Sequence, residues 1–214
     1  MKNLISLATL LALLPVCASA QTYVRAAAIW QDIDDVEVTG AARFMSSVDE
    51  AYGISAAVGY KFGGIRAEAE VISISNEFAS DGAGTTATTY AKGDIDQYRL
   101  SANIYYDIPI LPIVHPYIGA GVGLGHFSIN DFQGVKGTDN YVGDGDANIL
   151  AFQFMVGLKA ELPIEGLFVY GGYRFVRTDG YEQEFNNSDP TATDAFNVIM
   201  KSSNMFELGV GYTF

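Results

Sequence analysis

The last eleven residues, 204–214, alternate strictly between apolar side chains and polar or small ones, and the sequence ends on a phenylalanine. Successive side chains of a β-strand face opposite sides, so these residues would form one continuous apolar face and one face of small or polar residues. A strand of this kind is typical of an outer-membrane β-barrel, whose wall contacts lipid on one side. The apolar face comprises Phe206, Leu208, Val210, Tyr212 and Phe214.

The first twenty residues have the pattern of a secretory signal. An apolar run covers residues 4–16, and Ala18-Ser19-Ala20 follows it as an Ala-x-Ala cleavage motif. The apolar run is too short to span a bilayer as a helix. The only cysteine, Cys17, lies inside this segment, so the mature chain contains no disulfide. We therefore expect a cleaved signal peptide, 1–20, and a single β-barrel domain, 21–214.

The charge of the chain excludes some partners. The formal net charge is −13, and losing the single lysine of residues 1–20 takes it to −14. Nucleic acid needs basic patches, so it is not an expected ligand. The carboxylates of Asp32–Asp35 and Asp144–Asp146 are close enough for calcium ligands, but their spacing matches no complete calcium loop and is read as surface charge. His115 has no second ligand for zinc. We expect neither a cofactor nor a metal site.

Segments of period-2 alternation, separated by turn residues, predict about eight strands. They lie near residues 23–31, 52–62, 65–74, 97–108, 117–127, 150–160, 167–176 and 204–214. Short turns follow the second, fourth and sixth strands, whereas long connections follow the first, third, fifth and seventh. The predicted fold is therefore all-β: a closed antiparallel transmembrane β-barrel with four long extracellular loops, short periplasmic turns and both termini in the periplasm of a bacterial outer membrane.

Two features favour a membrane barrel over a soluble one, since both kinds show alternation. The polar faces of the strands are rich in Gly, Ser, Ala and Asn, which suits the crowded interior of a narrow barrel. Aromatic residues also concentrate near strand ends, where interfacial girdles lie. The predicted interfacial aromatics are Tyr23, Trp30, Tyr60, Phe62, Tyr106, Tyr117, Phe127, Tyr173 and Phe175.

Three segments carry a family resemblance: Pro116–Gly125, Val169–Phe175 and Phe206–Phe214. With them the chain resembles the porin-like, opacity-type and surface-antigen family of small bacterial outer-membrane barrels, related in architecture to the OmpA membrane domain. The resemblance implies an integral outer-membrane protein surrounded by lipid and lipopolysaccharide. The last segment is similar to the signal by which the barrel-assembly machinery recognises its substrates, which implies that machinery as a partner.

Charged residues on the inward strand faces are predicted to meet inside the barrel. Buried ions require partners, so we expect ion pairs and hydrogen bonds to fill the lumen. The alternative is a narrow porin-like channel, in which these pairs exchange to let ions or small solutes pass. The predicted lumen residues are Arg66, Glu68, Glu70, Arg99, Lys159, Glu161, Arg174 and Glu207.

A second alternative rests on His126 and Ser128, two residues apart on one strand face. A His-x-Ser pair resembles that of the outer-membrane lipid A deacylases, in which a histidine takes the serine proton and an acid orients the histidine. Asp131 or Asp139 would have to be that acid. Ile129 stands where the deacylase pattern has an asparagine, so we do not expect an enzyme.

The expected function is structural or surface-interactive. Family members of this size act as envelope anchors, adhesins, surface antigens or weak pores, and the fold alone does not choose among these roles. Because specificity usually resides in long loops, any host or cell-surface ligand is expected to contact the extracellular side.

Overall fold

The computed structural model describes residues 21–32, 36–39, 51–82, 89–136, 139–178, 197–200 and 202–214. Side chains are described for residues 21–32, 51–75, 96–128, 148–178 and 202–214. The predicted signal peptide, residues 1–20, lies outside the described residues. In the described part of the chain there is no helix long and apolar enough to cross a membrane.

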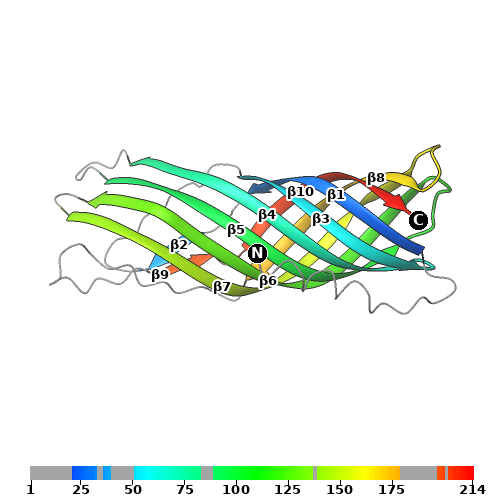
Figure 1. The fold of residues 1–214 in the computed structure, drawn as a ribbon, viewed down its shortest axis with the longest axis horizontal. Helices are drawn as coiled ribbons and strands as arrows, with labels where there is room; N and C mark the ends of the chain where they lie inside the picture. Colours follow the sequence, from blue (N-terminus) through cyan, green and yellow to red (C-terminus); the bar gives the residue numbers. More distant parts are fainter. Residues whose placement is uncertain are drawn as a thin grey trace, which may run out of the picture.

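Eight antiparallel strands close into a barrel in the order β1-β10-β8-β7-β6-β5-β4-β3 (Figure 1). They are β1 Gln21–Asp32, β3 Ala51–Phe62, β4 Ile65–Gly82, β5 Thr89–Asp107, β6 Val114–Lys136, β7 Asp139–Glu161, β8 Leu167–Thr178 and β10 Ser202–Thr213. Strand β1 closes the barrel by pairing with both β10 and β3. The prediction of a closed eight-stranded antiparallel barrel is confirmed.

Three short connections lie at one end of the barrel, which we call the turn end. They are Gly63-Gly64, residues 108–113 and residues 162–166. Gly63 and Gly166 have φ values of 58° and 77°, a left-handed conformation that glycine adopts without steric cost. Phe214 donates its backbone N–H to the carbonyl of Thr22, so both barrel termini also lie at the turn end. The opposite end is called the loop end.

Strands β4 to β7 extend much further at the loop end than their alternation predicted. They contain 18, 19, 23 and 23 residues, whereas β1, β3, β8 and β10 contain 12 each. The β4–β5 pairing continues to Gly82↔Thr89, and the β6–β7 pairing to Lys136↔Asp139. Hairpin strands satisfy each other's backbone hydrogen bonds whatever their side chains, so these polar segments form strand where alternation indicated loop.

A small second sheet joins two of the other long connections. Strand β2, Val36–Thr39, pairs antiparallel with β9, Asn197–Met200. In Figure 1 this pair and the extended ends of β4 to β7 lie on the same side of the barrel, away from the C-terminus. The loop end therefore contains strand-paired backbone in the connections after the first, third, fifth and seventh barrel strands.

The inward and outward faces of the barrel differ sharply in composition. Large apolar side chains cover the outside, among them Ile54, Leu124 and Phe154 with 68%, 65% and 63% of their surface exposed. Inside, charged and tyrosine side chains occupy the half nearest the turn end. Closer to the loop end the inward positions become mostly apolar. The core of this protein is thus the lumen, and it is divided into two parts.

Candidate functional site

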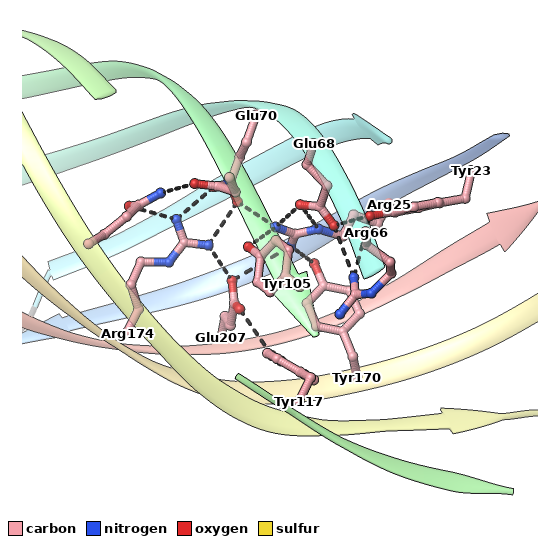
Figure 2. Close-up of polar contacts among 12 residues, drawn as sticks. Tyr23, Arg25, Arg66, Glu68, Glu70, Tyr105, Tyr117, Tyr170, Arg174 and Glu207 are labelled. Carbon is pink, nitrogen blue, oxygen red and sulfur yellow. Dashed lines mark hydrogen bonds and ion pairs between the residues drawn. The ribbon is translucent and has the colours of Figure 1, made fainter. Parts of the chain in front are cut away.

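The turn-end half of the lumen contains a continuous cluster of buried charged groups, which we call the ion-pair network. It comprises Arg25, Arg66, Glu68, Glu70, Asp107, Lys159, Arg174 and Glu207, each with at most 5% of its surface exposed. They come from strands β1, β4, β5, β7, β8 and β10. Figure 2 shows how Arg25, Arg66, Glu68, Glu70, Arg174 and Glu207 point toward one another inside the barrel.

Glu70 lies at the centre of the network and is completely buried. Arg174 binds both of its carboxylate oxygens, at 2.7 and 2.9 Å, and Arg25 Nη2 lies 3.0 Å from Oε1. Asn103 donates a further hydrogen bond of 2.8 Å. Such a two-pronged guanidinium–carboxylate contact is among the strongest polar interactions in proteins. Arg174 also reaches Glu207 at 2.8 Å, so one arginine joins two carboxylates (Figure 2).

Arg25 connects Glu70 to the rest of the network. Its Nε donates to Glu68 at 2.8 Å, and its Nη1 donates to the Tyr170 hydroxyl at 2.5 Å. Its guanidinium carbon lies 4.9 Å from the centre of the Tyr170 ring, within the range of a cation–π contact. Arg25 was not among the predicted lumen residues. The sequence does contain a signal, because Arg25 lies an even number of positions from Ile29 and Gln31 and therefore shares their strand face (the same parity). Three consecutive alanines, residues 26–28, obscure this alternation.

Arg66 and Lys159 lie nearer the turn end. Arg66 pairs with Glu68 at 3.1 Å and with Asp107 at 2.9 Å, and Lys159 lies 3.6 Å from Asp107. Asp107 is a second residue that the predicted set lacked, although its inward parity is visible in the sequence. Glu161 does not belong to the buried network, because its side chain is 49% exposed. It lies at the turn-end rim, 3.6 to 3.9 Å from Lys159, His115 and Lys61.

Arg99 is a correction to the predicted network. Its side chain is inward and only 3% exposed, but no carboxylate of the described residues lies within ion-pairing distance. Its Nη2 instead lies 3.6 Å from Met205 Sδ. Parity correctly indicated its face, but not its level along the barrel. The inward acidic side chains of the described residues gather toward the turn end, and Arg99 lies at the boundary with the apolar half of the lumen.

Two aromatic residues predicted at the membrane interface are also corrections. Tyr23 and Tyr117 are 1% and 2% exposed, because both project into the lumen. Tyr23 donates a hydrogen bond of 2.5 Å to Glu68, and Tyr117 donates one of 3.3 Å to Glu207. Their rings lie against inward glycines, where a Cβ on Gly59 or Gly157 would overlap them. Phe127 has the same inward parity as Tyr117, so it is not an outward girdle residue either.

The other predicted aromatics and the terminal strand face outward. Trp30, Phe62 and Tyr106 are 39%, 63% and 48% exposed. Tyr60, Tyr173 and Phe175 are partly exposed, and the Tyr173 hydroxyl donates to Asn204 Oδ1. The terminal apolar series is exposed along its whole length: Phe206, Leu208, Val210, Tyr212 and Phe214, with 43% to 72% of their surfaces accessible. These side chains therefore share the outer face, as their alternation indicates.

The loop-end half of the lumen contains an apolar cluster: Ile29, Ala51, Ile72, Ile74, Ala151, Val176 and Met205, each at most 2% exposed. It was not predicted, because inward charges in strands such as β4 suggested a polar lumen throughout. The signal was present in β4, where the inward series Arg66, Glu68, Glu70 continues as Ile72 and Ile74.

Packing between these groups is tight. The network encloses a cavity of about 10 Å³ next to Arg25, Arg66 and Glu207, roughly the space of one water molecule. Tyr105, Tyr117, Tyr170 and Phe168 also line this cavity. The arrangement can therefore hold charges in fixed pairs and fill the turn-end half of the lumen.

The candidate catalytic and calcium residues of the sequence are only partly described. His126 is exposed on β6, and its Nδ1 lies 3.1 Å from Asn148 Oδ1. The side chains of Asp131 and Asp139, proposed as the acid of a deacylase, lie outside the described side chains. So do those of Asp34, Asp35, Asp144 and Asp146. Among the described residues, no group of three or more histidine, cysteine or acidic side chains is arranged to hold a metal ion.

A family model for the outer membrane protein beta-barrel domain matches residues 5–214. The chain belongs to this family. It is therefore a bacterial outer-membrane β-barrel. No curated protein matches the sequence at a significant level.

Solved structures of outer-membrane proteins share the fold. Neisserial surface protein A has a TM-score of 0.57 and 19% identity, covering 91% of this chain and 99% of its own. A major outer membrane protein from Thermus thermophilus has a TM-score of 0.58 and 16% identity, and the match covers 91% of this chain and 99% of that protein. Outer membrane protein OprG from Pseudomonas aeruginosa has a TM-score of 0.59 and 15% identity, and the match covers 92% of this chain and 96% of OprG. At these identities the likeness concerns the fold alone.

Proposed function

We propose that this outer-membrane barrel is a closed scaffold that presents an acidic extracellular surface, with a structural or surface-interactive role in envelope integrity, adhesion or antigenicity. The observation that carries the proposal is the packing of the described lumen side chains: paired charges occupy one half, and a mostly apolar set, which also includes Gln31, Gln97 and Ser203, occupies the other. Among the described residues these side chains leave only the small cavity of about 10 Å³ in the network, which supports a role at the outer surfaces over passage through the lumen.

The proposed orientation places the turn end and both termini in the periplasm. Short turns on the periplasmic side and longer segments outside are the usual arrangement of bacterial barrels. A transmembrane strand needs only about 9–11 residues, so strands of 18 to 23 residues extend well beyond the membrane at the loop end. The two projecting hairpins, β4–β5 and β6–β7, would then stand outside the cell.

The projecting strand segments, residues 76–82, 89–96, 129–136 and 139–147, have an acidic sequence. They contain eight acidic residues and two lysines: Glu77, Asp81, Asp94, Asp96, Asp131, Asp139, Asp144 and Asp146, with Lys92 and Lys136. A surface of this charge favours basic patches on a host or neighbouring cell, or lipopolysaccharide phosphates bridged by divalent cations.

Neutralising the charge of these hairpins tests the surface role. One set of cells would carry the wild type and another a variant with these eight acidic residues changed to Asn or Gln. At equal amounts of the barrel on the cell surface, the two sets would be compared for adherence to host or neighbouring cells and for resistance to detergent. We expect the variant to lose adherence or envelope resistance. The matched control neutralises Glu161 and Glu165 at the turn end, which should leave both properties unchanged. Unaltered behaviour of the hairpin variant would contradict the proposal.

Conductance in planar lipid bilayers separates this proposal from the narrow channel. We expect no discrete current from the purified barrel. A discrete current that disappears in Arg66→Gln or Arg99→Gln would support the channel instead, because it would require ions to pass the lumen charges.

The terminal strand is proposed to act as the signal for the barrel-assembly machinery. Deletion of Phe214, or Phe214→Ser, should reduce the amount of heat-modifiable barrel in the outer membrane, whereas Ile164→Ser in a turn should not. Unchanged insertion of the Phe214 variants would refute this role.

We also infer that the chain is not an enzyme. Purified protein incubated with lipopolysaccharide should release no fatty acid. Release that Ser128→Ala abolishes would establish the deacylase alternative.

A further inference from the structure

Arg99 is a buried cation without a partner of opposite charge among the described residues. Its side chain projects inward from β5 with 3% of its surface exposed. Its Nη2 contacts the sulfur of Met205, and within the described part of the chain its Nε and Nη1 have no hydrogen-bond partner. Leaving a buried charge uncompensated is strongly destabilising, so an arginine in this position calls for a counter-charge.

The charges of the lumen give the same result. Among the described residues, five cations and four carboxylates are buried there: Arg25, Arg66, Arg99, Lys159 and Arg174 against Glu68, Glu70, Asp107 and Glu207. Each of the other four cations has a carboxylate within 3.6 Å. Lys159 also lies 3.6 Å from the half-exposed Glu161 at the rim. Among the described buried cations, Arg99 is therefore the one without a carboxylate within ion-pairing distance, and it lies on the side of the network that faces the apolar cluster.

Ser101 supplies a second unused polar group next to Arg99. It occupies the next inward position of β5, is 3% exposed, and its Oγ has no hydrogen-bond partner among the described residues. Two positions along a strand separate the Cα atoms by roughly 6.5–7 Å. On the neighbouring strand β6, Ser101 pairs with Gly123, and both the Ser101 Oγ and the Arg99 Cγ lie over this glycine, so the two side chains are adjacent.

We propose that Arg99 and Ser101 form an internal binding site for a small inorganic anion, of which chloride is the obvious representative. Guanidinium N–H groups and a hydroxyl are donors that hold anions in proteins. A water molecule would satisfy the hydrogen bonds but would not balance the charge. The anion must be small, because the site lies between two filled halves of the lumen. In this position it would supply the close counter-charge that Arg99 lacks among the described residues.

The test uses the full mature barrel and bromide, an anomalous scatterer that replaces chloride. Crystals grown in bromide should show an anomalous peak within hydrogen-bonding distance of the Arg99 guanidinium. In solution, replacing gluconate by saturating chloride should raise the unfolding temperature by roughly 5 °C, the scale that mass-action stabilisation gives a chain of this size. Arg99→Met removes the charge at similar length, and its unfolding temperature should not depend on chloride.

Arg177→Met is the matched control, since Arg177 is an exposed arginine on the outer face of β8. It should keep the chloride response of the wild type. The proposal is overturned if the wild-type map has no anomalous peak at Arg99, or if Arg99→Met retains the chloride response. If Arg99→Met does not fold, the wild-type bromide map decides alone.

Discussion

The two halves of the lumen are built on the same strands, but they are filled by opposite chemistry. On β4 the inward series runs from Arg66 through Glu70 to Ile74, and on β10 from Glu207 to Met205. Turn-end positions hold charges in specific pairs at 2.7 to 3.7 Å, whereas most loop-end positions pack apolar side chains without directional contacts.

This difference means that the two halves should respond differently to change. A charge in the network depends on partners from several strands, so removing one group leaves another buried and unpaired. An apolar side chain has no single partner, so its truncation costs only lost contacts and a cavity. Arg99 lies where one kind of packing replaces the other, which explains why it differs from the other buried cations of the described residues in having no carboxylate. Four substitutions test this comparison, from the largest expected effect to the smallest.

Glu70→Gln should be the most damaging change, because it leaves Arg25 and Arg174 with one carboxylate fewer in a buried site. We expect a loss of about 3–5 kcal/mol in the free energy of unfolding, measured by urea titration in lipid vesicles. The control, Glu161→Gln, alters a side chain that is 49% exposed and should cost under about 0.5 kcal/mol. Equal losses would show that the network is no stronger than a surface ion pair.

Ile74→Ala tests the apolar half. Ile74 is 1% exposed, and its truncation leaves a cavity, for which we expect a loss of about 3 kcal/mol in the same titration. Ile54→Ala on the lipid-facing side of β3 should lose only about 2 kcal/mol, because lipid closes the space and only the transfer term remains. If the outward change were the more costly one, tight packing of the loop-end half would be refuted.

Gly59→Ala tests the contact between strand wall and tyrosine. A Cβ at Gly59 overlaps the Tyr23 ring, which must move away from Glu68. Overpacking of this kind should destabilise the barrel by about 2 kcal/mol. At Gly171 the nearest atoms to an added Cβ lie 3.6 Å away, so Gly171→Ala should change stability by less than about 0.5 kcal/mol. Similar effects of the two alanines would contradict the proposed ring position.

Tyr117→Phe should have the smallest effect of the four, because Tyr117 only contacts the ion-pair network from outside it. It removes one long hydrogen bond of 3.3 Å to Glu207 but keeps the ring against Gly157. Because Glu207 retains Arg174, we expect a loss below about 1 kcal/mol. A loss as large as that of Glu70→Gln would mean that the tyrosine hydroxyls, and not the ion pairs, dominate this half.

Much of this organisation was predictable from alternation. The parity of Glu68, Arg174 and Glu207 indicated their inward position correctly, and that of Leu208 its outward position. Where prediction relied on other signals it was less reliable. The prediction that Tyr23 and Tyr117 lie at the membrane interface rests on their position near strand ends. Their strand faces, which they share with Arg25 and Gly119, indicate the lumen instead. The long strands β6 and β7 escaped prediction because hairpin pairing outside the membrane requires no alternation.

By itself the sequence determined the class of fold, the strand order along the chain and the face on which most side chains lie, because a two-residue period follows directly from backbone geometry. Only the tertiary structure decided which inward residues meet. Contacts such as Arg25 with Glu70, or Arg99 with Met205, join strands far apart in sequence, and they depend on the stagger of neighbouring strands around the closed barrel. That stagger sets the level of each side chain along the axis, and parity carries no information about it.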